Sequence, residues 1–220
     1  MSWKWAAVCL VAALAGAAPS ALNGPRADRV EGLRSGDADV RQAAKEGIVR
    51  DYDETIAALE GVIQQGLGDK DWGQIHEELL DRVSLKGEPV PAKYLSAASA
   101  IQALGELRAV RSVPLLVRHF GFRPGYSIVY DHAKLLEDYP AALALANIGV
   151  PSLERVLELY KERPGDVRSI VWMMLDKVLG PELQREYVLN AIAAEKNPEK
   201  QEILREILPG AREPRKTGED

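Results

Sequence analysis

Apolar side chains along most of the chain recur every three or four positions, with polar residues between them. Four stretches show this spacing most plainly: Ile56, Leu59 and Ile63; Ile75, Leu79 and Val83; Leu153, Val156, Leu157 and Tyr160; and Val167, Ile170, Val171 and Met174. Such a period places the apolar residues of each stretch on one face of an α-helix. The strict alternation that marks β-strands is nearly absent. The pattern predicts an all-α fold whose helices bury their apolar faces against one another.

Capping signals divide the chain into ten expected helices. Asp71 and Gln74 have the spacing of a capping box, Asn197 precedes a proline at a first helical position, and Gly180-Pro181 ends one helix and opens the next. Because most connections are short, neighbouring helices are expected to run antiparallel. The expected helices are 38–49, 53–65, 72–84, 92–106, 112–120, 132–148, 151–162, 166–179, 181–195 and 198–208.

Two of these helices are rich in small residues and resemble each other. Residues 97–105 read AASAIQALG and lead into VPLL, whereas residues 141–149 read AALALANIG and lead into VPSL. The glycines that end the two runs, Gly105 and Gly149, are 44 positions apart. Alanine on a helix face lets a neighbouring helix approach closely, so units of this kind can stack. Arrays of helix pairs have repeat periods of about 40–47 residues, which agrees with this spacing.

A second stretch, GDADVRQAA at 36–44, resembles the start of the first helix of a HEAT repeat. This resemblance implies an α-α superhelix of stacked antiparallel helix pairs over residues 35–208. The spacing is irregular, with an additional helix near 72–84, and the rival interpretations are a tetratricopeptide array and a generic helical bundle. In the HEAT family an Asp and an Arg near the start of this helix commonly bond between adjacent repeats. The resemblance therefore implies a structural ladder made by Asp39, Arg41, Asp166 and Arg168.

The N-terminus has the features of a secretory signal peptide. Lys4 gives it a positive start, an apolar run extends from Trp5 to Ala15, and the Ala-Gly-Ala sequence at 15–17 fits the small-residue cleavage pattern. The run is shorter than the roughly 20 residues that a transmembrane helix needs. We therefore expect residues 1–17 to be a cleaved signal and the protein to be periplasmic or extracellular, without membrane insertion. An uncleaved anchor and a plain first helix are the alternatives.

Composition limits the remaining possibilities. Residues 18–34 are expected to be a linker, because they are rich in small and helix-breaking residues. Residues 209–220 are expected to be a disordered tail, because they are polar and have no hydrophobic anchor. Cys9 lies in the apolar run, so cleavage would leave no disulfide, no thiolate metal ligand and no cysteine nucleophile. The formal net charge of −5 becomes −6 without Lys4. This mild acidity argues against a nucleic-acid partner, which would favour a basic face.

Motifs for catalysis or metal binding are incomplete. The run that begins at His76 starts like a zinc-protease helix, but Leu80 stands where the second histidine is required. Glu78, in this run, is expected with its neighbours to form a solvated charged face. The run that begins at Gly125 starts like the nucleophile elbow of serine hydrolases, but Val129 occupies the second glycine position. The sequence therefore predicts no catalytic residue, no metal site and no cofactor.

The most unusual segment runs from Gly121 to Asp131 (GFRPGYSIVYD) and interrupts the array between two helix pairs. It and its borders hold several of the few aromatic residues of the chain. Long loops on rigid scaffolds often carry function, and tyrosine, arginine and histidine are good contact residues. The alternative is that these aromatics fill a gap where the repeat is irregular.

We expect a protein-binding module or scaffold in the cell envelope, without catalysis. Stacked repeats create an extended surface from the second helix of each pair, which here includes Glu154, Lys161 and Tyr187 and carries both signs of charge. The alternatives are a structural domain without a ligand and a small-ligand or enzymatic role of residues 119–139. The candidate partner-binding residues are Arg118, His119, Phe122, Tyr126, Tyr130, Arg155 and Glu158.

Overall fold

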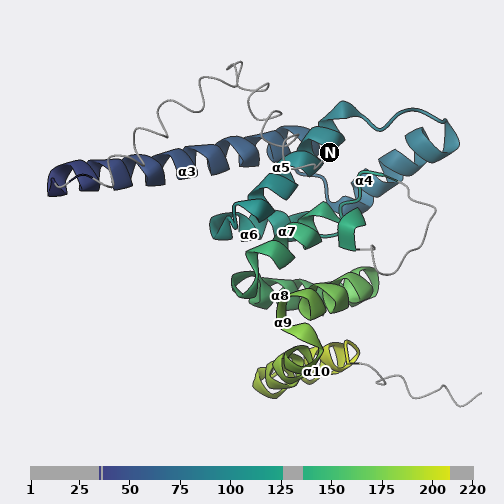
Figure 1. The fold of residues 1–220 in the computed structure, drawn as a ribbon. Coiled ribbons are helices and arrows are strands. Elements are labelled where there is room, and N and C mark those ends of the chain that lie inside the picture. The colour runs from purple at the N-terminus through teal and green to yellow at the C-terminus, as the bar shows by residue number, and fades with distance from the viewer. Residues whose placement is uncertain (1–34, 36, 126–135, 209–220) are drawn as a thin grey trace, which may run out of the picture.

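The computed structural model describes residues 35, 37–125 and 136–208, and at Lys45, Ile48 and Asp166 it describes the backbone only. Every regular element in these residues is a helix, which confirms the all-α prediction (Figure 1). A π-helical turn, Leu80–Leu85, continues α4. The 3₁₀ turns Val110–Ser112 and Val150–Ser152 precede α6 and α8. The α-helices are α3 (Ala38–Leu67), α4 (Trp72–Leu79), α5 (Ala92–Glu106), α6 (Val113–Arg118), α7 (Pro140–Ile148), α8 (Leu153–Glu162), α9 (Pro164–Ala194) and α10 (Pro198–Arg205).

Helices that are distant in sequence pack in a regular order. α3 packs on α5, α5 on α7 and α7 on α9, while α6 packs on α8 and α8 on α10. α6 also contacts α7, and α8 contacts α9, so the two series touch. Figure 1 shows α3 at one end of this body and α10 at the other, with the N-terminal part of α3 extending beyond the body. The candidate site lies at the α10 end.

Small residues bring α3, α5 and α7 close together. A Cβ atom at Gly105 of α5 would lie 2.6 Å from the Cα of Ala144 on α7. A Cβ at Gly66 of α3 would lie 2.6 Å from the carbonyl oxygen of Lys93 and 2.9 Å from the Cβ of Ala97, both on α5. Contacts below 3.0 Å leave no room for a side chain. The prediction that small residues allow close helix approach is therefore confirmed at Gly105 and Ala144.

The two small-residue helices, α5 and α7, end differently. Gly105 lies inside α5, whereas Gly149 ends α7 with a φ of 86°. At the end of α5 the positive φ, 51°, belongs to Arg108, whose N–H bonds to the carbonyl of Gly105. The 3₁₀ turns that begin at Val110 and Val150 are 40 positions apart. The two glycines that lie 44 positions apart in the sequence therefore have different structural roles.

One predicted helix boundary is absent from the structure and another is present. The predicted helices 38–49 and 53–65 form one helix, α3, because the residues between them contain neither glycine nor proline and the Thr55 hydroxyl donates to the carbonyl of Asp51 within a continuous helix. The predicted break at Gly180 is confirmed, since Gly180 has φ 74° and ψ 166° inside α9. Pro181 then begins a second segment, where a missing N–H costs nothing.

Several predicted segments lie partly or wholly outside the described residues. α7 begins at Pro140 rather than at 132, and residues 132–135 lie outside the described part. The signal, linker and tail expected at 1–17, 18–34 and 209–220 also lie outside it. None of the described helices is long and apolar enough to cross a membrane.

Glu78 is not the solvated carboxylate that the sequence predicts. Its Oε2 accepts hydrogen bonds from the Lys70 ammonium at 2.7 Å and from the Tyr94 hydroxyl at 2.6 Å. These bonds, first that from Lys70, lower the pKa of Glu78 to about 2. Tyr94 is fully buried in α5, so the contact ties α4 to the body. The prediction holds for Glu77 and Asp81, which are exposed, but it was wrong for Glu78, because a helical period does not reveal which polar residue contacts a buried tyrosine.

Candidate functional site

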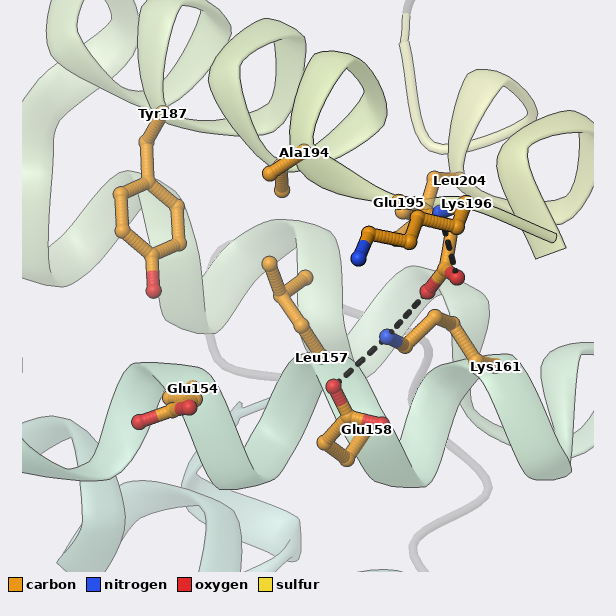
Figure 2. Close-up of a pocket in the computed structure, with 10 residues that line it drawn as sticks. Glu154, Leu157, Glu158, Lys161, Tyr187, Ala194, Glu195, Lys196 and Leu204 are labelled. Atoms are coloured by element: carbon orange, nitrogen blue, oxygen red, sulfur yellow. Dashed lines mark hydrogen bonds and ion pairs between the residues drawn. The ribbon is translucent and has the colours of Figure 1, made fainter.

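A groove of about 400 Å³ lies between α8, the second segment of α9 and α10 (Figure 2). Figure 2 shows α8 along one side and α9 along the other, with side chains from both directed into the space between them. Leu204 of α10 also lines it. The residues that line the groove are Glu154, Leu157, Glu158, Lys161, Tyr187, Ala191, Ala194, Glu195, Lys196 and Leu204.

Helical spacing explains why these residues share one groove. α8 is strongly amphipathic: its core face holds Leu153, Val156 and Tyr160, which are fully buried. Its groove face presents Glu154, Glu158 and Lys161, which have the i, i+4, i+7 spacing of one helical stripe. On α9 the stripe with the same spacing is Tyr187, Ala191 and Ala194. A row of charged side chains on α8 therefore faces a row of mostly small side chains on α9.

One end of the groove is closed by a charge network. The Lys161 ammonium donates to Glu158 Oε1 at 2.6 Å and to Glu195 Oε2 at 2.7 Å, and only 10% of its side chain is exposed. Burial works against its charge, but the bonds to both glutamates outweigh this and raise the pKa of Lys161. The bond from Lys161, with that from the Asn197 N–H, lowers the pKa of Glu195 to about 2. Lys161 and Glu195 therefore stay ionised at neutral pH.

The other end of the groove holds a tyrosine and a carboxylate. Tyr187 is half-buried, and Glu154 on α8 is exposed. Burial raises the pKa of the Tyr187 phenol, and the negative charge of Glu154 adds to the effect. The floor between the two ends is apolar, with Leu157 only 5% exposed and Leu204 only 1%. An apolar floor between polar ends is typical of sites that bind a short segment of another molecule.

The chemistry available in the groove is that of binding. Lys161 is protonated and hydrogen-bonded on two sides, so it lacks the free amine that a nucleophile needs. No cluster of three or more His, Cys, Asp or Glu side chains with metal-site geometry occurs within residues 35, 37–125 and 136–208. The predicted absence of catalysis and of a cofactor stays a prediction.

The structure separates the predicted partner-binding residues. Glu158 lines the groove, and Arg155 is exposed on the same helix. Arg118, at the end of α6, donates from Nη2 to Asp69 Oδ1 at 2.9 Å and to the Asp69 carbonyl at 3.0 Å. Tyr126 and Tyr130 lie outside the described residues.

His119 and Phe122 lie in the core rather than on the surface. Phe122 is 1% exposed, and its ring centroid is 6.2 Å from that of Tyr94. His119 is fully buried, and its two ring nitrogens have no hydrogen-bond partner among the residues that the structure describes. Burial, with a smaller effect of the Arg118 charge, lowers the pKa of His119 to about 4. For these two residues the packing alternative holds, since neither side chain can reach a partner from the surface.

The ladder implied by the HEAT resemblance stays a prediction. Arg41 Nη1 donates to the Ser35 carbonyl at 2.7 Å, and the Asp39 N–H donates to the Asp37 carboxylate at 2.8 Å, so their described contacts are local to the start of α3. Arg168 is half-buried in α9, and the side chain of Asp166 is not described.

Arginines elsewhere join parts that are distant in sequence. Arg111 Nη1 lies 3.0 Å from Asp53 Oδ1 on α3, as Arg118 lies against Asp69. No local motif marks these pairs, so they could not be predicted from the sequence. Ala191, Ala194 and Glu195 of the groove were not predicted either. The spacing of Ala191 and Ala194 from Tyr187 was a usable signal, but only packing shows that this stripe faces α8.

Comparison with protein-family models, with curated proteins and with solved structures finds no match to this chain. The function must therefore be argued from the geometry of the groove.

Proposed function

We propose that this protein is a binding module that holds a short segment of a partner protein in the groove between α8 and α9. The observation that carries the proposal is the convergence of Glu154, Glu158, Lys161 and Tyr187 on one groove. These residues belong to the interaction face that the sequence predicts, because they lie on the expected second helices of their pairs. Their meeting around an apolar floor supports that assignment.

The packing order supports a HEAT-like α-α superhelix as the scaffold of this module. The series α3, α5, α7 and α9 and the series α6, α8 and α10 each pack in order along the chain. This is the neighbour-only pattern of stacked helix pairs, which form extended binding surfaces. The 40-residue register of the two 3₁₀ turns falls within the HEAT period.

We further propose that the module works outside the cytoplasm, as the signal-like residues 1–17 suggest. A binding role without catalysis agrees with a groove in which Lys161, Glu158 and Glu195 are held in ion pairs. Mixed charge around an apolar floor suits a polypeptide, which offers both apolar and charged side chains.

A library of random nonapeptides, displayed on phage and selected on the immobilised full chain, tests the proposal. The blocking variant is Ala191→Trp, because an indole there would fill the groove. The matched control is Ala193→Trp, an exposed alanine on the same helix that does not line the groove. Peptides that bind the wild type and the control but not the blocked variant would support the proposal. Failure to select peptides, or equal binding to all three proteins, would contradict it and favour a structural domain without a ligand.

A further inference from the structure

We infer that the partner segment carries a lysine or arginine two residues away from an aliphatic residue, with the cation at the end of the groove formed by Glu154 and Tyr187. The inference rests on the proposed function, because it names the chemistry of the segment that this groove binds. Its basis is the difference in charge between the two ends and the helical spacing of the residues between them.

Glu154 is the acceptor for this cation. Among the residues that the structure describes, Glu154 has no cationic partner within ion-pair distance, and its side chain is exposed. Tyr187 lines the groove with it, and its phenol feels the charge of Glu154. An ammonium or guanidinium group here would meet a carboxylate, a phenol oxygen and the face of an aromatic ring. Each of these attracts a cation.

At the opposite end the buried cation is already paired. Lys161 is 10% exposed and donates to two glutamates, so its charge is already balanced. The lining of the groove holds three carboxylates, Glu154, Glu158 and Glu195, against two ammonium groups, Lys161 and Lys196. The groove as a whole therefore favours a basic segment over an acidic one.

Spacing along the helices sets the distance from the cation to the aliphatic residue. Leu157 follows Glu154 by three residues, about 4.5 Å along the axis of α8, and Ala191 follows Tyr187 by four, about 6 Å along α9. In an extended segment, side chains that point the same way are two residues and about 6.6 Å apart. A segment with its cation at Glu154 and Tyr187 would therefore place the side chain two positions away over Leu157 and Ala191.

The peptides selected on the full chain provide the test. We expect lysine or arginine to be enriched two positions from leucine, isoleucine, valine or methionine, in either chain direction. The most enriched peptide, labelled with fluorescein, is then titrated by anisotropy against wild type and Glu154→Gln. Replacing its cation with glutamine should weaken binding to the wild type about threefold to tenfold but binding to Glu154→Gln less than about twofold, since the pair would already be broken. Glu162→Gln, the same charge change at an exposed α8 residue outside the groove, should behave like the wild type.

The outcomes separate the inference from the proposed function. Peptides that bind in an Ala191-dependent manner but lack a cation would overturn the inference and leave the groove as a binding site. The inference would also be overturned if the selected peptides were acidic, or if removal of the cation weakened binding to wild type and to Glu154→Gln equally. Absence of groove-dependent peptides would instead overturn the proposed function.

Discussion

The guanidinium carbon of Arg163 lies 3.8 Å from the ring centroid of Trp72, although the two residues are 91 positions apart in the chain. Arg163 stands at the junction of α8 and α9, and Trp72 begins α4. Arg163 Nη1 also lies 3.5 Å from Asp71 Oδ2, the side chain that caps α4. One arginine thus joins the first part of the body to the helix that forms one wall of the groove.

Arg163→Ala should lower the free energy of unfolding by about 1 kcal/mol, since a cation over a largely buried indole contributes about that much. Urea denaturation followed by circular dichroism measures the change. Arg155→Ala, which removes an exposed arginine from α8, is the control and should change stability by less than about 0.5 kcal/mol. Equal losses in the two variants would mean that the Arg163–Trp72 contact contributes nothing of its own.

Elements whose signals are local could be predicted from the sequence. The expected helix 92–106 coincides with α5, and the capping box of Asp71 and Gln74 is present with both of its hydrogen bonds. Asn197 caps α10 as its position before Pro198 predicts. These features depend on residues within one turn of each other, so the pattern carries them without knowledge of the tertiary fold.

Features that depend on packing between distant segments could not be predicted in this way. Phe122 and His119 belong to an aromatic-rich segment that had the composition of a contact loop, yet both are in the core. The groove brings Glu154 of α8 together with Tyr187 of α9, which lies beyond the break at Gly180. The sequence marks this break but does not fix the angle between the two segments of α9. The candidate site was therefore recovered in part, through the residues of α8 and Tyr187.

Glycine-to-alanine substitutions in two helices should have opposite effects. Gly105→Ala should destabilise the protein by about 1–3 kcal/mol, because the new methyl group would lie 2.6 Å from the backbone of Ala144. Gly61→Ala should stabilise it by about 0.5–1 kcal/mol, because nothing lies within 4 Å of the new Cβ and alanine favours the helix. Thermal unfolding of both variants measures the difference. A stabilised Gly105→Ala protein would show that α5 and α7 are not in close contact.

Arg108 is a second position where one substitution should increase stability. It has a φ of 51°. The N–H of Ala109 donates to the carbonyl of Leu104, and the N–H of Arg108 donates to the carbonyl of Gly105. Helix ends with these two bonds usually have glycine at the position of Arg108. Arg108→Gly should raise the free energy of unfolding by about 0.5–1 kcal/mol by removing the strain of a side chain at positive φ. Arg108→Ala keeps that strain and should bring no gain. A gain in both variants would point to the arginine charge rather than to the backbone.

The burial of His119 should make the protein less stable in mild acid. Its pKa falls from 6.5 to about 4 on folding, so between these values the unfolded chain binds a proton that the folded chain does not. Stability should therefore decrease as the pH falls from about 7 to 4, by up to about 3 kcal/mol at about 1.4 kcal/mol for each unit of pKa shift. Urea denaturation at a series of pH values measures this slope. His119→Leu should flatten it whatever its stability at pH 7, whereas His76→Gln, at an exposed histidine, should retain it. An unchanged slope in His119→Leu would mean that other groups set the pH dependence, and that protonation of the buried imidazole does not oppose folding.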